Sequence, residues 1–126
     1  MAFLQSAQQA VADPTTPAAI RLTLEFLLAN AVGRSNAIPM HVILEHLEDN
    51  GFPMSGPGFQ TTILSQCRAG DGLGEIFIGS GPHGYFLIAG PDDARVMLDF
   101  YESRIASEQE RVAHIHRLMQ HENWNI

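Results

Sequence analysis

The stretch from Ser55 to Arg68 carries a group of polar, mostly uncharged side chains at helical spacing. The group consists of Gln60, Thr61, Thr62, Ser65, Gln66 and Arg68. Glutamine can pair with adenine, arginine with guanine, and a threonine methyl group can contact thymine, so these residue types can read DNA bases. A polar, uncharged helix face is also what many domains expose to water. The residue types therefore leave base reading and a solvated or protein-binding face both open.

Three residues elsewhere are candidates for contact with the DNA backbone. Arg21 lies on the first long helical segment and Arg34 follows it, and Arg34 is the better candidate because a loop leaves it exposed. His83 lies in a Gly/Pro-rich hairpin tip, where it can reach a phosphate or the minor groove. A neutral loop histidine more often has no such role.

The residues do not predict catalysis or a metal site. His114 and His116 are two residues apart and so lie on different sides of a helix, and no Cys/His set has zinc-finger spacing. The glycines at 70, 72 and 74 lie between a helix and a strand, unlike a phosphate-binding loop. We therefore expect no enzyme activity, no cofactor and no bound metal.

The charge distribution argues against strong nucleic-acid binding. The chain of 126 residues has a formal net charge of −7, and its seven basic residues are all arginine. Three acids, Glu45, Glu48 and Asp49, have no nearby basic residue, and residues 52–91 are nearly neutral. DNA-binding proteins usually neutralise several phosphates with Lys and Arg. A dimer would be needed to assemble even a modest positive patch.

The composition is that of an ordinary globular protein, with 45% hydrophobic and 17% charged residues. No apolar run predicts a membrane span, and the N-terminus lacks the basic region of a secretory signal. The single cysteine, Cys67, excludes an internal disulfide and is expected to be a small buried residue. These features predict a cytoplasmic protein.

The order of predicted elements is helix, helix, helix, hairpin, followed by a long helix. Residues 3–12 can form a short helix within an N-terminal arm (residues 1–14) that is either docked or frayed. Further helices are predicted at 17–33, at 39–51 and after Ser55, the last with Phe59, Ile63 and Leu64 inward. Strands at 75–79 and 84–88 flank the hairpin tip of residues 80–83. This order predicts a mainly α fold with a small β-hairpin.

The last predicted helix, residues 91–122, has a heptad pattern. Apolar residues alternate at spacings of three and four along Leu98, Tyr101, Ile105, Glu108, Val112, Ile115 and Met119, with Glu108 the exception. This pattern is typical of a coiled-coil seam. Leu98, Tyr101 and Ile105 can instead pack on their own domain, whereas Val112, Ile115 and Met119 favour a homodimer. Glu108 weakens a simple parallel dimer, although Arg104 and Arg111 can pair with it across the interface.

The strings FQTTILSQCRAGDG and IFIGSGPHGYFLIAGPDDA resemble the third helix and wing of small winged helix-turn-helix regulators, which are frequent in phages and prophages. The likeness covers residues 17–105 in architecture but only Gly84–Leu87 in local sequence. It implies a winged-helix domain at 15–91 and a dimerisation helix at 92–126. This chain differs from the group in its charge, because its third predicted helix has one arginine and its hairpin has none.

Two hypotheses follow from these patterns. The first is a dimeric winged-helix protein that binds double-stranded DNA and regulates transcription in a phage or mobile element. The second is an acidic winged-helix module that binds a host protein, for example an inhibitor of a nucleic-acid enzyme or a DNA mimic. The acidic residues at 45–49 and along the last helix support the second.

Overall fold

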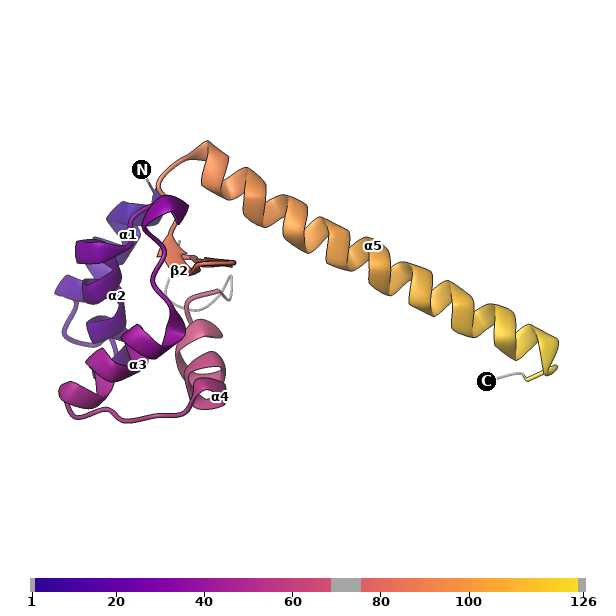
Figure 1. Cartoon of the computed structure of the whole chain (residues 1–126), viewed down its shortest axis with the longest axis horizontal. Coiled ribbons are helices and arrows are strands. Elements are labelled where there is room, and N and C mark those ends of the chain that lie inside the picture. The colour runs from indigo at the N-terminus through magenta and orange to yellow at the C-terminus, as the bar shows by residue number, and fades with distance from the viewer. Residues whose placement is uncertain (1, 69–75, 125–126) are drawn as a thin grey trace. The chain divides into compact units, whose positions relative to one another are not determined.

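The computed structural model describes residues 2–68 and 76–124, and the chain divides into two compact units, Met1–Asp93 and Ala94–Ile126. The first unit, which we call the body, holds helices α1 to α4 and a two-stranded antiparallel sheet. The second unit holds most of one long helix, α5 (Figure 1). The prediction of a mainly helical protein with a small hairpin and a long C-terminal helix is confirmed.

The N-terminal segment forms helix α1 (Ala2–Ala12), which packs against α2 (Ala18–Asn30). Ala7 is fully buried and Ala10 is nearly so, because their small side chains allow close approach of the two helices. In the turn after α1, the Thr15 backbone amide and hydroxyl donate to the Asp13 carboxylate and lower its pKa. Of the two alternatives for this segment, the docked arm is the observed one.

Helix α2 ends at Asn30, three residues before the predicted end at Gly33. The backbone beyond it pairs with strand β2 (Gly84–Leu87) instead of continuing the helix. Leu87 N donates to Ala31 O, and Gly33 N donates to Leu87 O, both at 2.8 Å. Gly33 has φ 87°, a positive value that favours glycine, but its ψ of 149° is not that of the left-handed cap expected for it.

A short 3-10 turn, η1 (Arg34–Asn36), leads to a second pairing with β2. Ile38 N donates to Tyr85 O at 2.9 Å, and Tyr85 N donates to Ile38 O at 2.8 Å. The segment between α2 and α3 therefore pairs with β2 twice, through a parallel bridge between Val32 and Leu87 and an antiparallel bridge between Ile38 and Tyr85. This contact joins the hairpin to the helical part of the body.

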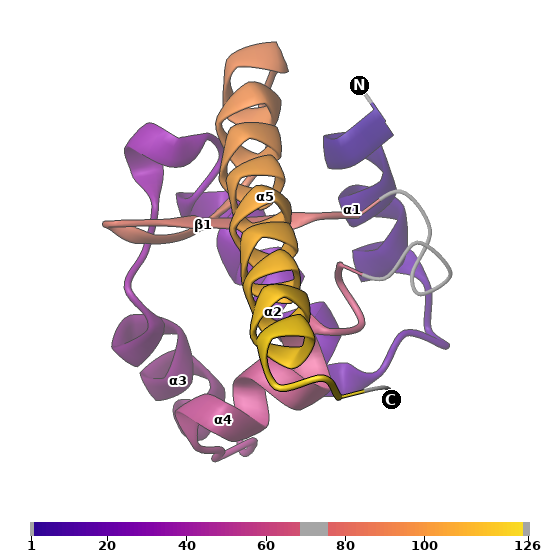
Figure 2. The ribbon, with the colours of Figure 1, turned by 90° about the vertical axis from the view of Figure 1, so that its right-hand side faces the viewer.

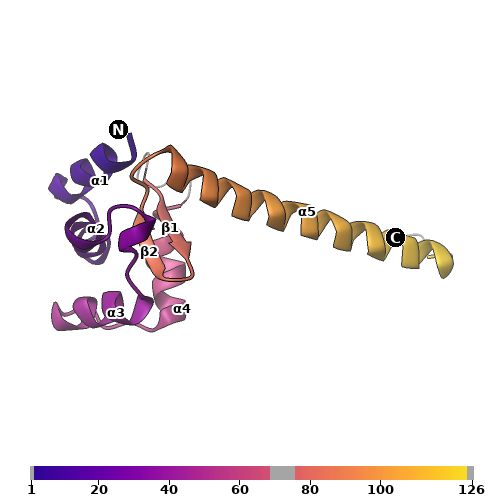
Figure 3. The same ribbon diagram turned by 45° about the horizontal axis from the view of Figure 1, so that its top comes forward.

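Helix α3 (Met40–Asp49) agrees with the prediction and ends in a Schellman motif at Gly51. Gly51 N donates to Glu48 O, and Phe52 N donates to Leu47 O, while Gly51 has φ 89°. Helices α3 and α4 (Gly56–Phe59) lie next to each other in the body (Figures 2 and 3). This is the pair of helices that the sequence predicts on either side of the Gly51 turn.

Only the first strand of the hairpin is displaced from its predicted position, because β2 (Gly84–Leu87) agrees with the predicted strand at 84–88 to within one residue. Strand β1 covers Ile78–Gly81, whereas 75–79 was expected, and residue 75 lies outside the described residues. Gly81 faces Gly84, so only Pro82 and His83 form the tip. Gly79 faces Phe86, whose ring atoms would lie 2.6 Å from a Cβ at position 79. This register therefore leaves no room for a side chain at position 79.

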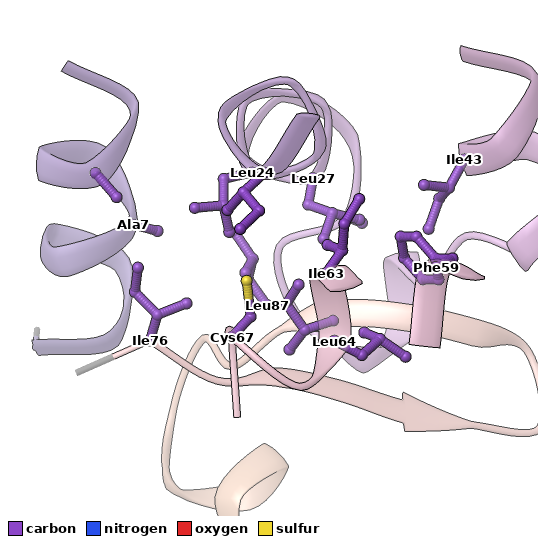
Figure 4. Close-up of a cluster of buried hydrophobic side chains, with 14 of the residues drawn as sticks. Ala7, Leu24, Leu27, Ile43, Phe59, Ile63, Leu64, Cys67, Ile76 and Leu87 are labelled. Atoms are coloured by element: carbon purple, nitrogen blue, oxygen red, sulfur yellow. The ribbon is translucent and has the colours of Figure 1, made fainter. Parts of the chain in front are cut away.

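The core of the body gathers side chains from all of its helices and from the hairpin (Figure 4). Its labelled members are Ala7 from α1, Leu24 and Leu27 from α2, Ile43 from α3, and Phe59, Ile63, Leu64, Cys67, Ile76 and Leu87 from the segments that follow. Helix α5 runs from Pro91 to His121, as predicted. None of the helices in residues 2–68 and 76–124 combines the length and hydropathy needed to cross a membrane.

Candidate nucleic-acid interface

The third helix of the predicted trio separates its side chains into a buried and an exposed side. It begins as α4, with the Ser55 hydroxyl accepting from Gly58 N at 3.1 Å, and continues as the π-helical turn η2 (Gln60–Leu64). Phe59, Ile63 and Leu64 are buried, as expected. The exposed side, which we call the polar face, consists of Gln60, Thr61, Thr62, Ser65 and Gln66. The structure thus brings together five of the eight residues predicted to contact DNA.

The hydroxyl groups of the polar face are bound to the backbone of their own helix. Thr61 Oγ1 donates to Pro57 O at 3.1 Å, Thr62 Oγ1 donates to Gly58 O at 2.6 Å, and Ser65 Oγ donates to Thr61 O. Their protons are used, so each oxygen can only accept a further bond, for example from a base amino group. Gln60 and Gln66 remain as side chains able both to donate and to accept.

A π-helical turn on this face was not predicted. Ser65 N donates to Gln60 O at 3.1 Å, a bond that spans five residues. Such turns are uncommon and occur frequently at functional sites. The sequence signal that could have indicated it is the run of hydroxyl residues, since Ser and Thr bonded to the preceding turn distort helices.

Arg68 is turned away from the polar face. Its Nε donates to Ile78 O at 2.8 Å, its guanidinium lies 5.6 Å from the centre of the Phe77 ring, and its Nη2 is buried. The side chain connects the end of the third helix to the first strand of the hairpin. Helical spacing predicts Arg68 on the exposed side, whereas its side chain is half-buried.

The two remaining predicted contacts lie on other elements. His83 is exposed at the hairpin tip, as expected. Arg34 is in η1, where its Nε lies 3.9 Å from Asp93 Oδ1. Asp93 lies in the first turn of α5, where its acidic side chain suits the helix N-terminus, and it is buried and also accepts from Ala89 N at 3.0 Å. Arg34 is therefore partly neutralised by an acid from the start of α5.

Three acidic residues of the body lie on the helix that packs against α4. Glu45, Glu48 and Asp49 are all exposed on α3, which packs against α4. Negative charge beside a DNA-reading helix opposes the approach of phosphates. The charge of this region therefore opposes DNA binding, whereas the hydrogen-bonding side chains of the polar face favour it.

Cys67 follows Gln66 in the chain, lies in the core of the body and has no access to solvent. Burial raises the pKa of its thiol to about 12, so it carries no thiolate near neutral pH. A buried, protonated thiol is a poor nucleophile and a poor metal ligand. Across the part of the chain that the structure describes, no group of three His, Cys, Asp or Glu side chains is positioned to hold a metal ion.

The predicted dimer residues lie along α5. Ile105, Val112 and Ile115 are between 53% and 57% exposed, and Tyr101 and Met119 are half-buried. Helix α5 therefore presents a line of apolar side chains to solvent. Its ion pairs, Arg95 with Asp99 and Arg111 with Glu108, form within the helix itself.

Comparisons of the chain with protein-family models, with curated proteins and with solved structures found no match.

Proposed function

We propose that this protein is a dimeric winged-helix DNA-binding protein that regulates transcription in a phage or mobile element. The observation that carries the proposal is the polar face of Gln60, Thr61, Thr62, Ser65 and Gln66 on a capped helix placed directly before a hairpin. In winged-helix proteins the helix in that position enters the major groove.

The connection between the hairpin and the helices supports the same proposal. Ile38, between α2 and α3, bridges Tyr85 of β2, so the order is helix, bridge, helix, helix, hairpin. That order is the topology expected of a winged helix, with the segment around Ile38 as its short first strand. The tip at Pro82 and His83 would then lie along the DNA backbone.

Gln60 and Gln66 are the base-reading residues of this proposal. Each amide can form a bidentate pair with adenine, whereas the hydroxyl groups of Thr61, Thr62 and Ser65 can add acceptors. Arg68 no longer belongs to the reading set, because Ile78 O and Phe77 hold its guanidinium. The proposed site therefore reads bases almost without positive charge, and its affinity should depend only weakly on salt.

Fluorescence anisotropy with DNA from the regions flanking the gene tests this proposal. The full chain is titrated at about 150 mM salt with competitor DNA, a condition that suppresses purely electrostatic binding. Gln66→Ala is expected to weaken binding to the preferred fragment by about 1–3 kcal/mol, as for a lost bidentate base contact. Gln9→Ala, an exposed glutamine on α1, is the matched control and should bind as the wild type does.

Absence of binding to every fragment would refute the DNA-binding proposal. If Gln66→Ala binds the preferred fragment as tightly as the wild type does, the polar face does not read the bases of that fragment. A measurement of the salt dependence adds a further check, because a steep slope would require several phosphate contacts that this face does not offer.

A second candidate function is an acidic module that binds a host protein, such as an inhibitor of a nucleic-acid enzyme. The observation that favours it is the exposed acidic group on α3, Glu45, Glu48 and Asp49, with no lysine or arginine between 35 and 51. Charge of this kind can mimic phosphates and bind the basic surface of an enzyme. Replacing the three acids with glutamine should weaken binding to such a partner while leaving any DNA binding intact or stronger.

A further inference from the structure

Asn50 and Gly51 form the one Asn-Gly step of the chain, in the turn between α3 and α4. An asparagine that precedes glycine is prone to deamidation, because glycine has no side chain to hinder the attack of its backbone nitrogen on the asparagine amide. Both residues are exposed to solvent. The step therefore combines a reactive sequence with access to the water that the reaction consumes.

The reaction requires only the chain and water. Gly51 N loses its proton to a base in the solvent and attacks Asn50 Cγ, so that a new N–C bond closes a five-membered succinimide ring. The bond between Cγ and Nδ2 breaks, and Nδ2 takes up a proton and leaves as ammonia. Water then opens the ring, which yields isoaspartate when it attacks the backbone carbonyl and aspartate when it attacks Cγ. The net change is the replacement of one amide by one carboxyl group.

Three features of the turn oppose ring closure in the folded protein. Asn50 has ψ 15°, so Gly51 N nearly eclipses Asn50 N about the Cα–C bond, whereas the ring requires Gly51 N beside Cβ. Gly51 N also donates to Glu48 O at 3.0 Å, which directs this nitrogen toward α3. The leaving group is held as well, because Asn50 Nδ2 donates to His46 O at 2.8 Å. The attacking and leaving nitrogens are thus both bonded to carbonyl groups of α3.

Backbone bonds and the side chain of Phe52 hold this turn closed. The Schellman motif joins Gly51 N to Glu48 O, and Phe52 N to Leu47 O at 2.8 Å. The Phe52 side chain is partly buried against the core of the body. Exposed turns held by a few bonds open locally more often than the whole domain unfolds. Only an open turn allows rotation about the Asn50 Cα–C bond, so opening must precede the reaction.

Two other asparagines of the body provide an internal comparison. Asn30, Asn36 and Asn50 each donate from Nδ2 to the carbonyl oxygen four residues earlier, at 3.0, 2.9 and 2.8 Å. Asn30 and Asn36 are followed by alanine, whose Cβ hinders the attacking nitrogen. The side-chain bond is therefore shared, and the following residue distinguishes Asn50.

We propose that Asn50 is a deamidation site protected by the turn after α3, so that its amide becomes a carboxylate only when this turn opens. The product has no Nδ2 donor for His46 O, and its negative charge lies at the C-terminal end of α3, where the helix dipole disfavours it. Glu48 and Asp49 already place negative charge there. The modified turn is therefore harder to close, and the change is one-way because ammonia is lost. The site is independent of whether the polar face binds DNA.

Mass spectrometry after proteolytic digestion measures the conversion. The full chain is incubated at mildly alkaline pH, once in buffer and once unfolded in guanidinium chloride. In denaturant, Asn50 should convert several times faster than Asn30 and Asn36 of the same molecules. In buffer, its conversion should be slower than in denaturant by at least about tenfold, since the turn reacts only during the small fraction of time in which it is open.

Two truncations separate local opening of the turn from a general loss of stability. Phe52→Ala removes the side chain that anchors the turn and should speed the conversion of Asn50 in buffer. Leu4→Ala is the matched control, because Leu4 is also partly buried against the core of the body but lies on α1. This control should convert at a rate near that of the wild type. Circular dichroism checks that both variants fold.

Hydrogen exchange measures the effect of the product on the turn. Asn50→Asp reproduces the aspartate product and should speed the exchange of the amide hydrogens of Gly51 and Phe52. Asn36→Asp is the matched control, because it loses the same kind of bond and gains the same charge elsewhere in the body. It should leave the exchange of these two amides unchanged.

The outcomes decide the proposal. Preferential conversion of Asn50 in denaturant, protection in buffer and acceleration by Phe52→Ala alone support it. Equal rates for the three asparagines in denaturant, or equal rates for Asn50 in buffer and denaturant, would overturn it. Equal acceleration by the two truncations would overturn the turn as the protecting element, and unchanged exchange in Asn50→Asp would overturn the effect of the product.

Discussion

Gly84 lies where the hairpin approaches the backbone of Ile38, and Gly84→Ala is expected to destabilise the protein strongly. The residue has φ +122°, a conformation that side chains with a Cβ rarely adopt. A Cβ at this position would overlap the carbonyl group of Ile38 and lie 2.7 Å from Pro39 N. The Ile38 carbonyl group and Pro39 N belong to the backbone, so a change of side-chain rotamer cannot move them away.

The magnitude follows from these two terms. Backbone strain at such a φ costs about 1–3 kcal/mol. Forcing an additional carbon into a packed position costs about 1–3 kcal/mol. The free energy of unfolding should therefore fall by about 2–6 kcal/mol, and the Tm should fall by at least about 8 °C for a domain of this size. The bonds between Ile38 and Tyr85 at 2.8 and 2.9 Å would be lost first.

Urea denaturation followed by circular dichroism measures this change. Gly81→Ala is the matched control, because Gly81 faces Gly84 across the hairpin, has no positive φ, and has nothing within 4 Å of its added Cβ. Its free energy of unfolding should stay within about 0.5 kcal/mol of the wild type, as for most surface substitutions. If Gly84→Ala costs less than about 1 kcal/mol more than Gly81→Ala, the close approach of the Ile38 backbone to β2 is wrong.

Two further predictions concern the end of the third helix. Arg68→Ala should lower the free energy of unfolding by about 1–3 kcal/mol, because Ile78 O loses a charged donor. If urea denaturation shows unchanged stability, the bond to Ile78 O does not hold Arg68, and its side chain is available for DNA contact. Cys67, whose thiol pKa is raised to about 12, should make the protein less stable as pH rises above about 9. The unfolded thiol ionises first, so unfolding becomes easier by up to about 1.4 kcal/mol per pH unit. Cys67→Ala should lose less stability than the wild type between pH 9 and 11, and parallel pH profiles would contradict this assignment.

Local features of the sequence were sufficient to predict most helices. Gly51 ends α3, Ser55 caps α4, and Pro91 begins α5, each at the expected residue. Caps, proline and positive φ act within a few residues, so their effect does not depend on the rest of the fold. The inward positions Phe59, Ile63 and Leu64 were likewise predicted from helical spacing.

The candidate interface was predicted less completely. Spacing alone placed Gln60, Thr61, Thr62, Ser65 and Gln66 on one exposed side. Spacing also placed Arg68 among them, because nothing local indicates that Ile78 O and Phe77 lie within its reach. A long, flexible side chain follows whichever partner the tertiary structure supplies.

What the sequence by itself determined was the order and type of the elements, since periodicity and capping are encoded within each segment. The tertiary structure alone decided where α2 stops and which backbone the hairpin joins. Ala31, Gly33 and Ile38 form their bonds with Leu87 and Tyr85, about 50 residues away. Backbone groups are chemically the same at every residue, so their partners are selected by the packing of the whole body and not by local side-chain patterns.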